Sequence, residues 1–544
     1  MRNCVTSGSM PRWWIDLRRT ALLSWNAAGF LVALLIGRTT GRATAAILLR
    51  QALQRMGMTY LKLGQYLALR LDLLPSDVTR ELSKLFEAAE PMPPGDVRRV
   101  IESELGGRLE LVFARFEWSP VASASIAQVH EAVTSEGERV AVKVQRPDLE
   151  AAFEADMRGL TLAARTVDRL GLMGELSLRE AVEEFATYTR RELDFQLEAL
   201  TANRLRREAA FEEIVPRIVW GLSTRRVLTM EYIEGVSVGR VIEALSTGRE
   251  AELTAAVPEL DLRLASHNLA RASLHQMFGV GFFHADPHPG NLLLCRGNRV
   301  AYLDFGIFGQ LSPEQREIMA SYIEHLVIGD VEEAFRHYQR LLTPTAHTDL
   351  AAFKRESQDV QSRWYETSRH PAGAITHRLV APFADEMLTV VRRHRMRMNM
   401  DTLLFWRAMI VLDATLLQLC RDFDLLAEVG AYFRLTRPTL AERLVDTLRD
   451  SDALASLGQL ASRGPRVLRD ALADAAAGQL QVHATLRPSL HARRAERRRV
   501  ECVTLGLLGL SLIVAAGAFG VAAATALSSA AAVLFFVSLY RLRR

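Results

Sequence analysis

Helix-like and strand-like spacings of apolar residues divide most of the chain into three successive parts. Residues 1–100 mix apolar and basic positions and predict an N-terminal helical extension. Residues 101–235 alternate strand and helix patterns and end at Met230–Gly235, a segment that suits a hinge. Residues 236–480 predict mostly helix, and the region after Gly309 contains no motif with an interpretable chemistry. This order indicates an α+β protein in which a small lobe precedes a large helical lobe.

A stretch without charged residues, Val503–Tyr540, follows a basic linker at residues 481–502. As one helix it would be about 57 Å long, whereas the hydrocarbon core of a bilayer is roughly 30 Å thick. Two helices that turn near Gly517 and Gly520 fit this thickness better, so residues 503–540 predict a transmembrane helical hairpin. Basic residues flank it on both sides, at Arg493, Arg494, Arg497, Arg498, Arg499, Arg541, Arg543 and Arg544. Both ends are therefore expected in the cytoplasm. The alternative is a helical pair buried in a soluble core.

The composition excludes some functions. The formal charge of the 544 residues is only +4, and aromatic and basic residues do not interleave, so nucleic acid is not expected as a partner. The four cysteines are widely scattered without a Cys-x-x-Cys pair, which fits free thiols in a reducing compartment. The length accommodates a two-lobed domain with extensions at both ends.

Two segments of the second half carry the most specific chemistry, His284–Asn291 and Tyr302–Gly306. Asp286 and Asn291 are five positions apart, which is the spacing of a kinase catalytic loop. There the aspartate orients the attacking group and the asparagine holds a metal ion. Asp304 begins an Asp-Phe-Gly turn, whose carboxylate binds the Mg²⁺ that bridges the nucleotide phosphates. The pattern predicts phosphoryl transfer from ATP.

Upstream segments supply the other parts of a nucleotide site in the expected order. The apolar strand Val140–Lys143 ends in a lysine that would hold phosphates. The run Arg190–Ala199 predicts one helix, on which Asp194 and Glu198 share a face, and Glu198 is the expected partner of Lys143. Taken alone, such a run is more often a solvated acidic face, and its position in the chain favours the ion pair.

The loop that should cover the phosphates precedes the lysine strand and contains no glycine. Its proposed nucleotide-binding residues are Ala122, Ser123, Ala124 and Ser125, joined by Glu231 in the hinge. Alanine has a Cβ that limits φ and keeps the backbone farther from a phosphate than glycine does. The loop is therefore expected to hold the nucleotide in a pose different from that of ordinary protein kinases.

These motifs together resemble the UbiB (AarF) family of atypical, protein-kinase-like proteins over roughly Thr59–Gln310. The most specific signature is Lys62–Gln65, a Lys-x-Gly-Gln segment. The resemblance implies a bilobal kinase-like fold and a link to ubiquinone or other isoprenoid-lipid metabolism. It also implies that Lys62 and Gln65 lie on an extension that meets Glu192 and Asp194, gates the site and blocks docking of a protein substrate.

Several positions depart from the family or from ordinary kinases. The segment Ala68–Pro75 lacks the serine and threonine that are usual in the family, and Phe86-Glu87 replaces an expected Gln-Asp pair. Ordinary protein kinases place an arginine where Ala285 stands and a lysine where His288 stands. No Ala-Pro-Glu anchor follows Gly306, so a peptide-binding platform is not expected. None of these changes touches the proposed catalytic positions.

The resulting hypothesis is an atypical kinase or ATPase that uses Mg²⁺ and ATP and is anchored to the cytoplasmic membrane with its catalytic domain in the cytoplasm. Its expected partners are the lipid bilayer and enzymes of isoprenoid-lipid biosynthesis. Two alternatives remain, an ATP-gated scaffold for lipid-modifying enzymes and a small-molecule phosphotransferase of the aminoglycoside-kinase type. A further apolar segment, Ala27–Gly37, suits a packed or interfacial helix. A signal peptide is disfavoured there because exported protein would lack ATP.

Overall fold

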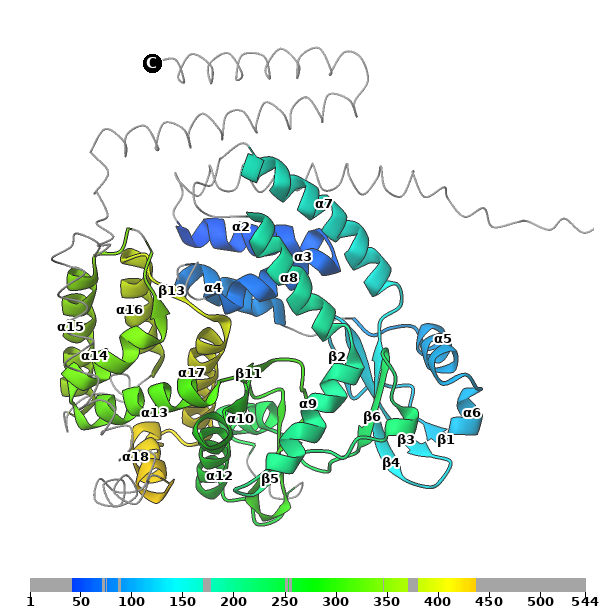
Figure 1. The fold of residues 1–544 in the computed structure, drawn as a ribbon. Helices are drawn as coiled ribbons and strands as arrows, with labels where there is room; N and C mark the ends of the chain where they lie inside the picture. Colours follow the sequence, from blue (N-terminus) through cyan, green and yellow to red (C-terminus); the bar gives the residue numbers. More distant parts are fainter. Residues whose placement is uncertain are drawn as a thin grey trace, which may run out of the picture.

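The computed structural model describes residues 42–436, except for gaps at residues 71–73, 75, 87–89, 170–177, 250–252, 254–256, 346 and 370–379. The predicted hairpin at residues 503–540, the basic linker at residues 481–502 and the segment Ala27–Gly37 lie outside the described residues. Figure 1 shows the described part as two lobes with a layer of helices above them.

The small lobe is built on an antiparallel sheet with strand order β1-β3-β4-β6, and β2 pairs with β3 at its side. Its strands are β1 (Phe113–Phe116), β2 (Ala122–Ser123), β3 (Ala127–Thr134), β4 (Arg139–Gln145) and β6 (Val227–Glu231). Buried and less buried residues alternate along most of β3, as expected for a strand with one covered face. Helix α5 (Pro94–Leu105) and the short α6 (Leu109–Val112) share a hydrophobic core with this sheet.

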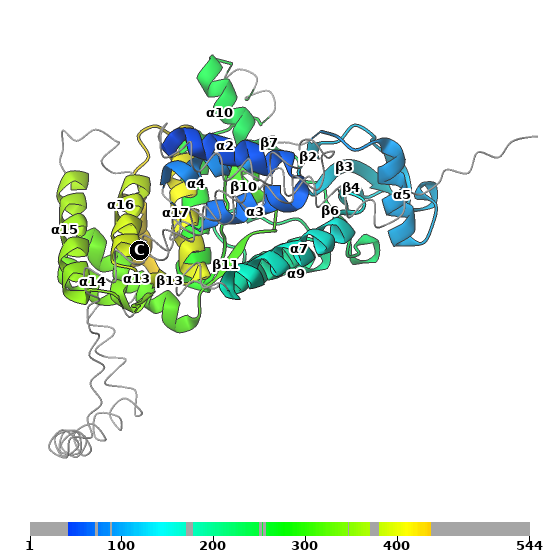
Figure 2. The same ribbon diagram turned by 90° about the horizontal axis from the view of Figure 1, so that it is seen from above.

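The large lobe combines short strand pairs with a helical bundle. Its strands are β5 (Glu213–Ile214), β7 (Val236–Ser237), β8 (Phe282–His284), β9 (Leu292–Cys295), β10 (Arg299–Tyr302), β11 (Phe308–Gln310), β12 (Leu342–Thr343) and β13 (Arg397–Met398). Its helices are α10 (Val238–Thr247), α12 (Leu262–Leu274), α13 (Pro313–Ile328), α14 (Val331–Arg340), α15 (Leu350–Arg369), α16 (Val380–Arg393), α17 (Met400–Leu419) and α18 (Leu425–Thr436). A π-helical turn, η3 (His275–Val280), follows α12, and the single turn η4 (Arg296–Asn298) joins β9 to β10. The turn η2 (Trp220–Leu222) belongs to the small lobe, where it contacts β6. In Figure 2 the helices α13 to α16 and the small lobe lie at opposite ends of the molecule.

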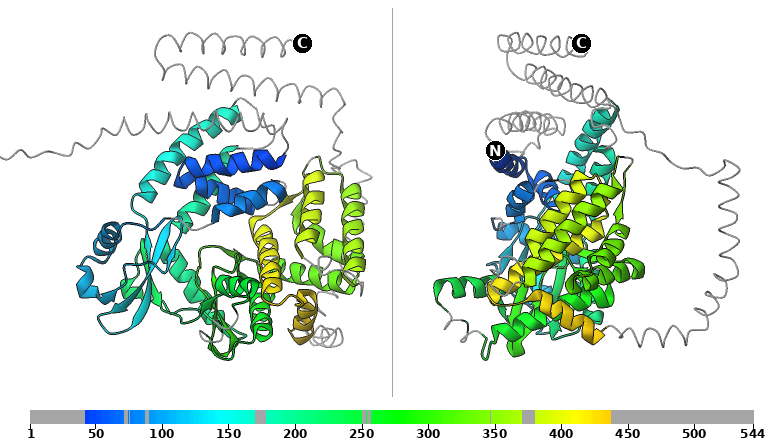
Figure 3. Two further views of the ribbon diagram at one scale, coloured as in Figure 1. Left: turned by 180° about the vertical axis from the view of Figure 1, so that it is seen from behind. Right: turned by 90° about the vertical axis from the view of Figure 1, so that its left-hand side faces the viewer.

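The N-terminal extension forms a helical layer against both lobes. It comprises α2 (Arg42–Arg55), α3 (Met58–Leu69), α4 (Ser76–Ser83) and the turn η1 (Lys84–Phe86). Two further long helices, α7 (Leu149–Arg169) and α8 (Leu178–Glu192), leave the small lobe after β4. Helix α3 contacts α7, α8 and also α17 of the large lobe. The left view of Figure 3, from behind the molecule, shows the extension in blue beside these helices. The extension is thereby placed beside the junction of the lobes.

Two local features differ from the sequence predictions. The run at residues 190–199 is not one helix, because α8 ends at Glu192 and α9 (Phe195–Glu208) begins after a break. Asp194 causes the break as the N-cap of α9, since its Oδ1 accepts the backbone N–H of Gln196 at 3.0 Å. Glu213 and Ile214 fall within the predicted small lobe, but β5 pairs with β10 in the sheet of the large lobe.

Candidate active site

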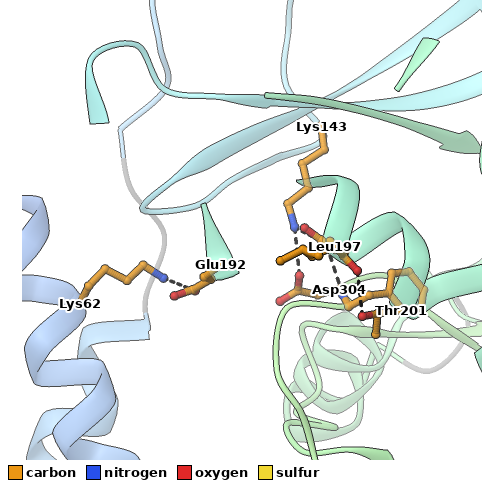
Figure 4. Close-up of polar contacts among 8 residues, drawn as sticks. Lys62, Lys143, Glu192, Leu197, Thr201 and Asp304 are labelled. Atoms are coloured by element: carbon orange, nitrogen blue, oxygen red, sulfur yellow. Dashed lines mark hydrogen bonds and ion pairs between the residues drawn. The ribbon is translucent and has the colours of Figure 1, made fainter. Parts of the chain in front are cut away.

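A lysine and two carboxylates meet where the lobes face each other. Lys143 Nζ donates to Glu198 Oε1 at 2.5 Å and to Asp304 Oδ1 at 3.0 Å. Lys143 comes from β4, Glu198 from the first turn of α9, and Asp304 from the loop after β10. Figure 4 shows Lys143 reaching down from the sheet toward Asp304. The structure thus brings together, from three elements of the chain, the lysine and the two carboxylates that the motifs predict as a site.

The electrostatics of this cluster are set by burial and by the shared lysine. Burial lowers the pKa of Lys143, but the carboxylates of Asp304 and Glu198 more than offset it and raise that pKa above its usual range. Burial raises the pKa of Glu198 to about 7, with Lys143 opposing this rise and Asp304 adding to it. Partial desolvation at the junction of the lobes acts to raise the pKa of Asp304, but Lys143 outweighs it and holds that pKa well below its usual range. Of the two carboxyl groups, Asp304 therefore ionises more readily than Glu198.

The backbone of the Asp-Phe-Gly turn contacts Glu198, the carboxylate that pairs with Lys143. The backbone N–H of Phe305 donates to Glu198 Oε1 at 3.3 Å, the same oxygen that accepts from Lys143. Phe305 itself is fully buried in the core of the large lobe. Glu198 therefore connects the lysine strand of one lobe to the Asp-Phe-Gly turn of the other.

Asn291 and Asp304 lie at the same end of one β-hairpin. Strands β9 and β10 pair with Leu292 opposite Tyr302, and the backbone N–H of Leu303 donates to the carbonyl of Asn291 at 2.9 Å. The Asn291 side chain donates its amide N–H to the carbonyl of Asp286 at 3.3 Å. This orientation leaves the amide oxygen of Asn291 available to a cation.

The donor set fits Mg²⁺ only together with phosphate oxygens. In the described part of the chain, no three His, Cys, Asp or Glu residues gather in a way that would hold a metal ion. Mg²⁺ is usually held by one or two protein oxygens, water and substrate phosphates. The carboxylate of Asp304, whose side chain is 40% exposed, and the amide oxygen of Asn291 match this requirement.

Asp286 follows a strand pair that fixes the catalytic loop. Strand β8 pairs with β11, and the backbone N–H of Ala285 donates to the carbonyl of Ile307 at 3.0 Å. The N–H of Asp286 donates to Nδ1 of the buried His284 at 3.0 Å. Burial lowers the pKa of His284 to about 4, so its ring is neutral and Nδ1 can accept. These bonds hold the backbone of the loop on the side that presents the Asp286 carboxylate.

A residue that the motifs did not reveal contacts this carboxylate. Arg407 Nη2 of helix α17 donates to Asp286 Oδ1 at 2.8 Å, and both side chains are largely buried. One signal was available, because Arg407 interrupts the apolar run of Met400–Leu419, and a charge buried in such a helix needs a partner. The partner itself lies 121 positions away and no local pattern identifies it.

The alanine-rich loop is held by a second arginine that the sequence analysis missed. Arg146, just after β4, donates to the carbonyl of Ala124 at 3.1 Å and to Ser123 Oγ at 3.1 Å. It also donates to the carbonyl of Glu90 at 2.5 Å. Ala122 and Ser123 form β2, and Ser125 is buried in the turn that follows. The loop is thus tied to the sheet and to the segment before α5.

The hinge lies against the large lobe. A Cβ on Gly235 would come within 2.8 Å of the carbonyl of Leu294 in β9, so only glycine fits this close approach. Glu231 ends β6, and its side chain accepts the backbone N–H of Arg217 at 3.1 Å. The Glu231 side chain is therefore engaged in the small lobe, and any contact with a nucleotide would come from its backbone.

Of the four residues predicted to gate the site, two contact each other and the other two bind elsewhere. Lys62 of α3 forms an ion pair with Glu192 at the end of α8, and Figure 4 shows the two side chains pointing toward each other. Gln65 is instead turned to the extension itself and donates to the carbonyl of Leu85 at 2.7 Å. Asp194 caps α9 and lies 3.7 Å from Arg225. The predicted meeting of Gln65 with Asp194 is absent among the described contacts, since Gln65 binds the turn η1 and Asp194 caps α9.

Comparisons with known proteins agree with these motifs. Residues 84–338 match the family model described as the ABC1 atypical kinase-like domain. The Arabidopsis thaliana protein ACTIVITY OF BC1 COMPLEX KINASE 7, chloroplastic, is 35% identical over 323 residues, which cover 58% of this chain and 44% of that protein. The uncharacterised protein sll0005 of Synechocystis is 37% identical over 318 residues, which cover 57% of this chain and 44% of that protein. The match spans less than half of the length of these relatives. The resemblance to the UbiB family is confirmed.

One solved structure is similar in part. The structure of Rv3197 in complex with erythromycin, from Mycobacterium tuberculosis, aligns with a TM-score of 0.49 and 24% identity, covering 70% of this chain and 92% of that chain.

Proposed function

We propose, from the premise that this chain carries an ABC1 atypical kinase-like domain of the UbiB family, that it is an atypical kinase or ATPase that binds Mg-ATP between its lobes. The observation that carries the proposal is the contact of Lys143 with both Glu198 and Asp304. In kinases a lysine on this strand holds the α- and β-phosphates and is itself positioned by a helix glutamate. Here the same lysine already joins the two lobes at the place where phosphates would lie.

Each remaining residue has a role that its geometry permits. A bound nucleotide would supply the phosphoryl group, and Mg²⁺ would neutralise charge on its phosphates. Asp304 and Asn291 would hold the cation with their side-chain oxygens. Asp286 would accept the proton of an attacking hydroxyl or water, because its carboxylate is fixed at the end of a rigid strand pair. The alanine-rich loop would cover the phosphates from the small lobe.

The contact of the extension with α8 favours a small or lipid acceptor. Lys62 and Glu192 are both mostly buried, with side chains 8% and 13% exposed. Helix α3 also contacts α17, which carries the partner of Asp286. A folded peptide segment would have to displace this layer to reach Asp286, whereas a small hydroxylated molecule would not. The acceptor is therefore proposed to be a small molecule or the head group of a membrane lipid.

The proposed place of action is the cytoplasmic face of a membrane, in support of ubiquinone or other isoprenoid-lipid metabolism. The charge-free segment at residues 503–540 with its basic flanks supports this location. Among the described residues, only helix α17 is apolar and long enough to cross a membrane, and two thirds of its apolar window are buried in the large lobe. Helix α17 is therefore assigned to the protein core, and anchoring is assigned to the C-terminal segment.

The test compares the full-length protein with Asp304→Asn in liposomes of neutral and anionic phospholipid. Wild type should bind ATP in a Mg²⁺-dependent manner and turn it over, whereas Asp304→Asn should keep its fold and lose Mg²⁺-dependent binding. The matched control is Asp330→Asn, which alters a carboxylate that accepts a backbone N–H, from Glu333, at the start of α14 and outside the cluster. Unchanged Mg²⁺-dependent turnover in folded Asp304→Asn would refute the metal assignment.

A second candidate is an ATP-gated scaffold for lipid-modifying enzymes. The buried Lys62–Glu192 pair favours it, because this contact would close the side from which an acceptor approaches Asp286. A scaffold would show nucleotide-dependent changes in amide exchange of α3, with no phosphoryl transfer to any acceptor. Transfer of the γ-phosphate to an added isoprenoid phenol would exclude this candidate. Transfer to soluble aminohydroxyl compounds, with no effect of liposomes, would favour the small-molecule phosphotransferase.

A further inference from the structure

Helix α17 is fastened to the catalytic loop and the adjoining strand at three points. Asp401 Oδ1 accepts the N–H of Gln310 in β11 at 3.0 Å, and Thr415 Oγ1 donates to the carbonyl of Pro287 at 3.3 Å. Between them Arg407 Nη2 donates to Asp286 Oδ1 at 2.8 Å. The helix begins with a capped turn, since Asn399 Oδ1 accepts the N–H of Thr402 at 2.8 Å. Arg407 is therefore presented to Asp286 by a rigid element.

The pair of Arg407 and Asp286 is buried and oriented. Their side chains are 12% and 5% exposed, so neither charge is compensated mainly by solvent. The hydrogen bond from Arg407 occupies Oδ1 of Asp286. Arg407 thus holds one oxygen of the carboxylate, and an attacking hydroxyl would donate its hydrogen bond to the other oxygen.

The positive charge beside Asp286 comes from outside its own loop. The two neighbouring positions that are basic in ordinary protein kinases are Ala285 and His288 here, and His288 Nδ1 accepts the N–H of Gly290 at 3.0 Å. The region that matches the family model ends at residue 338, whereas α17 begins at Met400. The helical region after the matched domain therefore completes the surroundings of the proposed catalytic aspartate.

We propose that Arg407 is a positioning residue for phosphoryl transfer, which holds Oδ1 of Asp286 so that Oδ2 faces the attacking hydroxyl or water. This inference rests on the proposed function. It assigns a role in turnover to a helix whose length and apolarity would otherwise mark it only as core. A misplacement of a reacting group by about 1 Å can cost on the order of 100-fold in rate. Loss of the guanidinium should therefore reduce turnover much more than nucleotide binding.

The experiment measures Mg-ATP affinity and turnover for wild type, Arg407→Gln, Arg407→Lys, Asp286→Asn and the double variant Asp286→Asn/Arg407→Gln. The matched control is Arg271→Gln, because Arg271 pairs with the buried Glu428 at 2.6 Å between α12 and α18, away from the loop. Melting temperatures identify variants that are simply unfolded.

Arg407→Gln should keep Mg-ATP affinity within about threefold and lose turnover by roughly 10- to 100-fold. Arg407→Lys should be intermediate, because an ammonium restores the charge without the planar geometry of the guanidinium. The double variant should turn over ATP no more slowly than Asp286→Asn, since Arg407 acts through Asp286. The control variant should keep wild-type turnover.

Three results would overturn the inference. They are wild-type turnover in a folded Arg407→Gln or Arg407→Lys variant, increased turnover on removal of the guanidinium, and a further loss in the double variant relative to Asp286→Asn. If Arg407→Gln does not fold, Arg407→Lys and the double variant decide the question. Absence of Mg-ATP binding in the wild type would instead refute the proposed function, and the inference with it.

Discussion

The glycine of the Lys-x-Gly-Gln segment gives a sharp test of how the extension is packed. A Cβ built on Gly64 would lie 2.3 Å from Leu85 Cδ1 and 2.9 Å from Leu53 Cδ1. Both leucines are buried in the core of the extension, at 2% and 6% exposure. Ordinary van der Waals contact begins near 3.4 Å. Gly64→Ala therefore requires both leucines to move within a filled core.

The change in the free energy of unfolding of Gly64→Ala is the sum of two opposing effects, on helix formation and on packing. Alanine is favoured over glycine in a helix interior by about 1 kcal/mol. Inserting one methyl group into a packed core costs about 1–3 kcal/mol. Gly159 in α7 supplies the matched comparison, because nothing lies within 4 Å of the position of its Cβ. The helix term is common to both substitutions, so their difference isolates the packing term. Gly64→Ala should be less stable than Gly159→Ala by about 1–3 kcal/mol.

The assay is urea unfolding of both variants and wild type, combined with amide hydrogen exchange of α3. Gly159→Ala should unfold at higher urea than wild type, and Gly64→Ala at lower urea than Gly159→Ala. Exchange in α3 should rise only in Gly64→Ala, because the displaced helix also loosens the contact of Lys62 with Glu192. Equal stability of the two variants, with unchanged exchange in α3, would refute the close packing of this segment.

Three other predictions concern the alanine-rich loop, a buried carboxyl group and the predicted membrane segment. Ala124→Gly should increase the preference for ATP over ADP, because removal of the Cβ lets the loop approach the terminal phosphate; a lower melting temperature with an unchanged ratio of the two dissociation constants would contradict this. Burial raises the pKa of Glu213 to about 7, so this group stabilises the fold less as the pH rises from about 4.5 to 7. Between pH 5 and pH 8, the free energy of unfolding of Glu213→Gln should therefore rise relative to that of wild type by up to about 3 kcal/mol. A difference between variant and wild type that does not change with pH would exclude the effect. A chain ended before Val503 should be soluble and still bind nucleotide, and its recovery in the membrane fraction would show that another segment anchors the protein.

The sequence by itself determined the parts of the site that depend on short spacings. Asp286 and Asn291 are tied to each other by a side-chain hydrogen bond within one loop. Asn291 and Asp304 lie near each other because strands β9 and β10 form a short hairpin, which brings Leu303 back beside Asn291. Such relations are encoded in a few consecutive residues, so a motif identifies them. The pairing of Lys143 with Glu198 was also predictable, because the order of motifs along the chain matched a known arrangement.

Only the tertiary structure decided which distant side chains complete these motifs. Asp194 was predicted to lie on a continuous helix, but its side chain caps the next helix, a choice between two local structures that packing resolves. Arg407 reaches Asp286 across 121 positions, and Arg146 ties Ala124 to the sheet across 22 positions. The periodicity of apolar positions indicates that a charged residue lies on a buried face. The identity of its partner depends on how whole helices and strands pack. The sequence thus contained the groups proposed to react, and the packing of α17 and of the small sheet determined how those groups are held.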